Sequence, residues 1–121
     1  MPVDRSLEAL LLLDGERFFV DDGGFFVVEF KVKNVGPTRE KPHGLDYSLV
    51  LIGPGGERLV GYDNAHPVRR SKGPAGKRQS RHDHRHAGER VRHYEYTDAA
   101  QLLADFWGDV DKALKERSVK P

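Results

Sequence analysis

Apolar and polar residues alternate along two stretches in the first half of the chain. In residues 25–35, phenylalanines and valines occupy one set of alternate positions, whereas Glu29, Lys31 and Lys33 occupy the other. This alternation is typical of a strand in an antiparallel sheet with one face in water. Gly-rich and Asp-rich turns separate such stretches and predict two hairpins. Their arms are residues 17–20 and 25–35, and residues 46–52 and 57–63.

A helical period marks the end of the chain. From Leu102 to Leu114 the apolar residues recur at the spacing of one helix face, and Thr97 is the expected N-cap. Residues 91–96 predict a last strand. Residues 7–13 are apolar nearly throughout, and we favour a short strand there. The predicted fold is α+β, with five or six antiparallel strands in hairpins or a meander and one C-terminal amphipathic helix on the apolar face.

Length and composition set the class of protein. The 121 residues predict a single domain over residues 1–121. No apolar run approaches the roughly 20 residues of a membrane helix, so we expect no membrane span. The chain has no cysteine, which excludes disulfides and cysteine nucleophiles. The N-terminal residues do not read as a signal peptide, and a cytoplasmic protein is expected.

The net charge of +1 hides an uneven distribution. Residues 67–93 hold nine Lys or Arg and two acids, a charge of +7, which leaves −6 for the rest of the chain. Five of the six histidines lie within residues 66–93. Residues 64–90 show neither a strand nor a helix period, and we interpret them as a long basic loop. A polyanionic partner such as RNA is the simplest electrostatic interpretation.

Two short polar clusters are candidates for chemistry. Tyr62-Asp63-Asn64-Ala65-His66 ends a predicted strand, and His82-Asp83-His84-Arg85-His86 follows about twenty residues later. One interpretation is a solvated loop in which Asp63 and Asn64 form turns. A second is a divalent metal site, because the three histidines of an extended segment share one face. The possible ligands are His82, His84 and His86.

A third interpretation, which we favour, is a phosphodiester site without a cofactor. One histidine accepts a proton and another donates one, since the ordinary pKa of histidine lies near neutrality. Arginines would hold the phosphate. The expected nucleic-acid contacts are Arg69, Arg70, Lys77, Arg78, Arg81 and Arg85. His43, in a loop, is interpreted as a solvated side chain.

At these residues the sequence resembles the TumE family, small proteins described as toxins of bacterial and archaeal toxin–antitoxin pairs. The matching motifs are Tyr62-Asp63-Asn64-Ala65-His66, His84-Arg85-His86, and Tyr94-Glu95-Tyr96 with its Leu-Leu-x-x-Phe helix. The chain departs from the family where His66 follows Ala65 directly, because many relatives carry Pro-His-His there. The resemblance implies the site residues Asp63, Asn64, His66, His84 and His86.

The resemblance also implies an antitoxin partner, expected to be a small helix-turn-helix protein, and a target in RNA or the translation machinery. The favoured hypothesis is a toxin that acts as an endoribonuclease, with His84 and His66 as the acid–base pair and Asp63 orienting a histidine. Two alternatives stay open. One is a non-catalytic module that binds nucleic acid or an acidic protein through the basic loop. The other is a metal-dependent hydrolase on the histidines.

Overall fold

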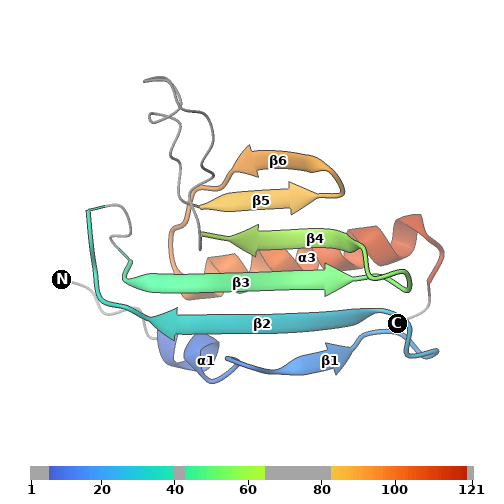
Figure 1. Ribbon diagram of the computed structural model, residues 1–121, viewed down its shortest axis with the longest axis horizontal. Helices are drawn as coiled ribbons and strands as arrows, with labels where there is room; N and C mark the ends of the chain where they lie inside the picture. Colours follow the sequence, from blue (N-terminus) through green and yellow to red (C-terminus); the bar gives the residue numbers. More distant parts are fainter. Residues whose placement is uncertain (1–5, 40–42, 65–82, 120–121) are drawn as a thin grey trace.

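A single antiparallel sheet organises the computed structural model, which describes residues 6–39, 43–64 and 83–119. Within these residues, six strands pair in chain order (Figure 1), so the predicted α+β sheet of hairpins is confirmed. The strands are β1 (Arg17–Phe19), β2 (Val27–Asn34), β3 (Leu45–Ile52), β4 (Arg58–Asp63), β5 (His84–Ala87) and β6 (Arg90–His93).

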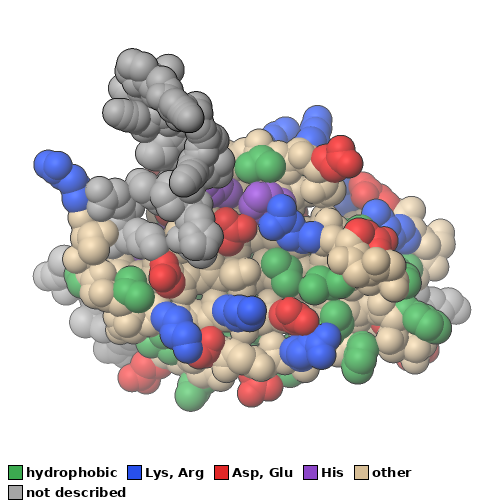
Figure 2. Space-filling view, in the orientation of Figure 1, with side chains coloured by type: hydrophobic (Ala, Val, Ile, Leu, Met, Phe, Trp, Pro, Cys, Tyr) green, Lys and Arg blue, Asp and Glu red, His purple; other side chains and the backbone are tan. Residues whose placement is uncertain are grey.

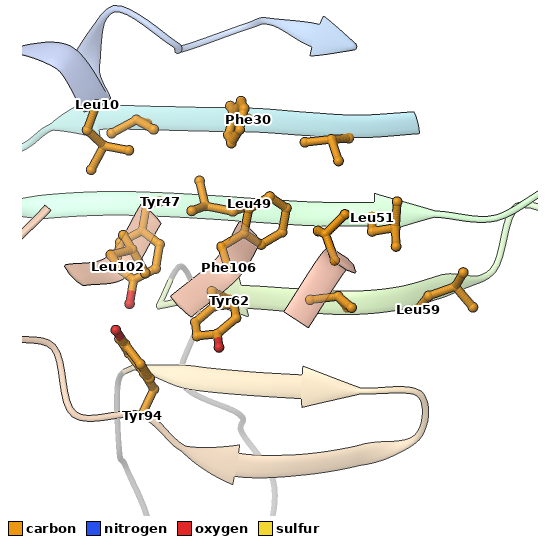
Figure 3. Packing of buried hydrophobic residues seen from close by; sticks show 14 of the residues in the cluster. Leu10, Phe30, Tyr47, Leu49, Leu51, Leu59, Tyr62, Tyr94, Leu102 and Phe106 are labelled. Carbon is orange, nitrogen blue, oxygen red and sulfur yellow. The ribbon is translucent and has the colours of Figure 1, made fainter. Parts of the chain in front are cut away.

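The C-terminal helix α3 (Ala99–Glu116) covers one face of the sheet, as its apolar period predicts. Phe106 is fully buried and makes edge contacts with Phe30 of β2 and Tyr62 of β4. Figure 3 shows Phe106 among the buried side chains, close to Leu49 and Tyr62. The predicted N-cap was one residue early, because Asp98 rather than Thr97 accepts the hydrogen bond from the Gln101 N–H.

The strand predicted for residues 7–13 is wrong. Leu7–Leu11 forms a short helix, α1, whose Leu10 is fully buried. Leu, Glu and Ala are strong helix formers, and an unbroken apolar run carries no period to reveal this. Helix α1 contacts both β2 and α3, and the Ser6 hydroxyl accepts a hydrogen bond from the Ala100 N–H. The contact with α3 therefore decides the structure of this segment.

The predicted loop over residues 64–90 is partly wrong. Its last residues form β5 and the start of β6, a hairpin that turns at Gly88 with a φ of 62°. Residues 65–82 lie outside the described residues. The sequence of β5 has no apolar alternation, so its pairing with β4 rather than a local pattern makes it a strand. In the described part of the chain, no helix is long and apolar enough to cross a membrane.

Phe106 and Trp107 allow a direct test of this packing. Phe106 is fully buried, whereas Trp107 is only partly buried against Phe30 and Phe106. Phe106→Ala should lower the free energy of unfolding by about 3–5 kcal/mol, because it leaves a cavity in the core. Trp107→Ala should cost clearly less. Urea denaturation of both variants measures the difference, and an equal cost would contradict the packing described here.

Candidate active site

The two sequence clusters meet where β4 and β5 pair. Asp63 lies directly opposite His84 in the antiparallel register, and His86 lies opposite Gly61. The neighbouring side chains Tyr62 and Arg85 both hydrogen-bond to Asp109 of α3. Since successive side chains of a strand point to opposite faces, Asp63 and His84 are on the face that α3 does not cover. Figure 2 shows histidines on that face over β4 and β5, beside acidic and basic side chains.

Four side chains form this site, which we call the Asp63 cluster: Arg58, Asp63, His84 and His86. The His86 Nε2 atom lies 3.0 Å from Asp63 Oδ2, and the His84 Nδ1 atom lies 3.8 Å from Asp63 Oδ1. Arg58 Nη2 donates a hydrogen bond of 3.0 Å to His86 Nδ1, and its Nη1 lies 3.8 Å from Asp63 Oδ2. One carboxylate is thus shared by two imidazoles and a guanidinium.

The Arg58 contact sets the tautomer of His86. A guanidinium only donates hydrogen bonds, so His86 Nδ1 must accept and the ring proton must be on Nε2. That proton faces Asp63, but the approach is not aligned as a hydrogen bond, and the buried Nε2 atom has no other partner. A buried donor without an aligned acceptor is costly and is frequent at functional sites. His86 Nε2 is therefore a buried N–H beside Asp63 without an aligned acceptor.

The surroundings of His84 favour a neutral imidazole. Burial lowers the pKa of His84 below its ordinary value of 6.5, and the nearby charge of Asp63 only partly offsets this effect. The electrostatic contributions of His86 and His93 to the pKa of His84 act in the same direction as burial. A lowered pKa keeps the imidazole neutral, and hence able to accept a proton, at neutral pH.

A glycine makes room for the arginine. A Cβ atom at Gly61 would meet Arg58 Cδ at 3.0 Å and His86 Cβ at 3.5 Å. The Arg58 side chain can therefore cross the open face of β4 to reach the ring of His86. A bulge in the β3–β4 pairing, between Leu51 and Ile52, precedes this crossing. Sequence reasoning missed Arg58, because it lies in a turn-proximal strand position with no distinctive spacing.

Asn64 has a different place from the other site residues. It is fully buried, and its side chain accepts a hydrogen bond from the Tyr47 N–H and donates one to the Leu45 carbonyl. These bonds continue the β3–β4 pairing with side-chain atoms. Asn64 thus holds the end of β4 in place, directly after Asp63.

A second polar cluster lies on the α3 side of the same strand ends, and we call it the Asp83 cluster: His43, Tyr47 and Asp83. The Asp83 carboxylate accepts hydrogen bonds from the Tyr47 hydroxyl at 2.7 Å and His43 Nε2 at 3.1 Å. His43 Nδ1 accepts from the Leu45 N–H, which leaves the ring proton on Nε2. The interpretation of His43 as solvated is wrong, since its side chain is 10% exposed. The forty residues between His43 and Asp83 hide this contact from sequence reasoning.

The polar side chains of this second cluster satisfy one another's hydrogen bonds. Burial raises the pKa of Tyr47, and so its hydroxyl remains a donor. Burial alone would raise the pKa of Asp83, but the hydrogen bonds from His43 and Tyr47 outweigh it and hold that pKa below 3.8. The Asp83 carbonyl also accepts a hydrogen bond from the Tyr94 N–H, which extends the β5–β6 pairing by one position. The cluster fixes the residue directly before His84.

Arg85 lies on the opposite face of the sheet from His84 and His86. Arg85 donates to Asp109 through Nε at 2.9 Å and Nη2 at 2.8 Å, on the face that α3 covers. It is therefore not beside His84 and His86, and Arg58 is the described arginine that is. The remaining expected residues lie outside the described residues: His66, Arg69, Arg70, Lys77, Arg78, Arg81 and His82. Among the His, Asp and Glu that the structure does describe, no group of three has the geometry of a metal site.

Comparison with known protein families places the chain in a class of toxins. A family model described as Toxin TumE matches residues 6–114, and the chain belongs to this family. It is thus the toxin component of a toxin–antitoxin system, and the family implies an antitoxin partner. No curated protein and no solved structure matches the chain.

The Asp83 cluster makes folding stability depend on pH. Because the folded pKa of Asp83 is depressed, its contribution is present above the unfolded pKa and is lost as the pH falls through the folded pKa. Asp83→Asn should lower the free energy of unfolding at pH 7 by about 1–3 kcal/mol. It should also flatten the decline of stability below about pH 5.

Urea unfolding from pH 7 down to about pH 3 measures both effects. The exposed Asp22, changed to Asn, is the matched control and should leave the profile unchanged. An Asp83→Asn profile parallel to that of the unaltered protein would show that the carboxylate is not held as described.

Proposed function

We propose that the chain is an endoribonuclease toxin whose reaction takes place at the Asp63 cluster. The observation that supports this most is the shared carboxylate of Asp63, which lies beside two imidazoles and one guanidinium. The two histidine side chains are 13% and 11% exposed, so charges in the cluster interact in a partly water-excluded environment. Such a set suits proton transfer at a phosphodiester.

His84 is the general base in this mechanism. Its neutral imidazole accepts the proton of a ribose 2′-hydroxyl, and the 2′-oxygen forms a bond to the adjacent phosphorus. The bond between phosphorus and the 5′-oxygen of the next nucleotide breaks. That oxygen leaves with its electron pair and takes a proton, so the products are a 2′,3′-cyclic phosphate and a 5′-hydroxyl end.

The leaving oxygen needs a proton donor. The hypothesis from the sequence assigns this role to His66, which lies outside the described residues, and we keep that assignment. His86 is neutral while its Nδ1 atom accepts from Arg58, so it contributes as a neighbour of Asp63 and not as the acid. Arg58 supplies positive charge for the phosphate oxygens as charge develops on them. Asp63 orients His84 and stabilises the imidazolium that forms there. Asn64 acts as a positioning residue.

We expect a toxin that cleaves RNA to act in the cytoplasm. The expected antitoxin is a small helix-turn-helix protein. Two controls separate this proposal from its alternatives. Cleavage that a chelator abolishes and a divalent ion restores would favour a metal-dependent hydrolase. Salt-sensitive RNA binding without any cleavage would favour a non-catalytic module.

His84 is the residue whose loss should be most informative. His84→Ala should lower the cleavage rate by about 10²–10⁴-fold and abolish toxicity, because no neutral base remains at this position. His93→Ala is the matched control: it removes an exposed histidine opposite His84 and should retain most activity. Single-turnover cleavage measures the rate, and thermal melting verifies the fold. A folded, fully toxic His84→Ala protein would rule out the proposed base.

Asp63→Asn should shift the pH dependence in a defined direction. The charge of Asp63 raises the pKa of His84 against the effect of burial, and so its removal lowers that pKa further. The acidic limb of the rate profile, which the pKa of His84 sets, should therefore move to lower pH. The maximal rate should fall about 10²-fold because the ring loses its orientation. A limb that moves to higher pH would contradict His84 as the base.

A further inference from the structure

A groove lies on the opposite side of the sheet from the Asp63 cluster. Helix α3 packs on β4, while the β5–β6 hairpin extends beyond the helix (Figure 1). The side of this hairpin that faces α3 therefore has incomplete cover. A groove of about 400 Å³ runs there, between the hairpin and the C-terminal half of α3.

The groove has an apolar floor and a cationic rim. Leu59 and Val60 of β4 and Ala113 of α3 line it and are buried within the fold. Its exposed charged lining residues are mainly basic, and they come from β6 and from the end of α3. They are Arg90, Arg92, Lys112 and Arg117, together with one acid, Glu116.

Most of these rim cations have no ion-pair partner among the residues that the structure describes. Arg85 and Asp109 also line the groove, but they neutralise each other in a bidentate ion pair. Arg90, Arg92 and Lys112 form no ion pair with any described acidic side chain. Like charges gathered around an apolar floor repel one another, so a ligand with carboxylates and aliphatic groups would relieve the repulsion.

The groove is bordered by the free edge of the sheet. Strand β6 is the last of the sheet, and all four of its residues, Arg90–His93, are exposed. An edge strand presents backbone N–H and C=O groups that a further extended chain can pair with. Arg90 and Arg92 point from this strand into the groove. A chain paired with β6 would place alternate side chains against the groove.

We propose that this groove binds an extended acidic peptide segment, which pairs with the edge of β6 and contacts the floor with aliphatic side chains. A protein ligand fits better than RNA, because no aromatic side chain lines the groove for base stacking. Membership of a toxin family supplies a protein partner, the antitoxin, as the source of such a segment. The proposal does not depend on RNA cleavage at the Asp63 cluster.

A binding titration tests the groove with the full chain. The probe is a fluorescein-labelled peptide of about eight residues in which Glu and Val alternate. Fluorescence anisotropy measures its binding. Binding should weaken with added salt, and Lys112→Glu should weaken it about tenfold or more. Lys115→Glu makes the same charge change one turn along α3 but outside the groove, and should have little effect. No binding, or equal loss in both variants, would overturn the proposal.

Two further arms test the strand pairing and the class of ligand. Methylation of alternate backbone nitrogens in the probe should abolish binding in one of the two frames and spare the other; equal binding in both frames would contradict pairing with β6. A single-stranded oligouridine should not compete at the groove. If it binds more tightly than the peptide and Lys112→Glu abolishes that binding, the groove is an RNA site and the proposal is wrong.

The His84→Ala variant separates this proposal from the proposed function. It should bind the peptide as the unaltered protein does, even though its cleavage activity is lost. Peptide binding that disappears with His84 would place the ligand on the other face and overturn the groove. Normal peptide binding in a chain that cleaves no RNA would leave the groove intact and refute only the endoribonuclease.

Discussion

The register between β4 and β5 is the constraint on which the rest of the structure depends. Tyr62 pairs with Arg85 and Asp63 pairs with His84, in adjacent positions of two short strands. Asp109 of α3 accepts hydrogen bonds from both Tyr62 and Arg85, and so ties this pair of strands to the helix. A slip of one residue would send every side chain of β5 to the other face. The same contacts that anchor the hairpin therefore present the histidines to the open face.

Two aspartates near His84 have opposite roles because their hydrogen bonding differs. Asp83 receives well-formed bonds from His43 and Tyr47, which hold its charge and fix the start of β5. Asp63 faces two imidazoles and Arg58 at distances of 3.0–3.8 Å, without an aligned bond from His86. A satisfied carboxylate contributes to structure, whereas an incompletely satisfied one can respond to a change of charge beside it. This contrast favours Asp63 over Asp83 as the reactive carboxylate.

Much of the fold could be predicted from the sequence, because burial leaves a period. The strands β2 and β3 alternate between the core and water, and the buried face of α3 repeats at helical spacing. The short helix α1 and strand β5 have no such period, since their conformations depend on contacts with distant elements. The meeting of Asp63 with His84 could be predicted because one ends a strand and the other lies in an extended segment. The approach of Arg58 could not, since it depends on the missing side chain of Gly61.

Strand β5 connects the two faces at which we place function. His84 and His86 point to the open face, whereas Arg85 and Ala87 line the groove beside α3. A ligand in the groove changes the reactivity of His84 only if it binds one arrangement of β5 more tightly than another. Two such arrangements of β5 would differ in whether Arg85 is paired with Asp109. This ion pair holds β5 against the helix, and a carboxylate of the ligand would compete for the same guanidinium. Binding in the groove would then act on the histidines through their shared backbone.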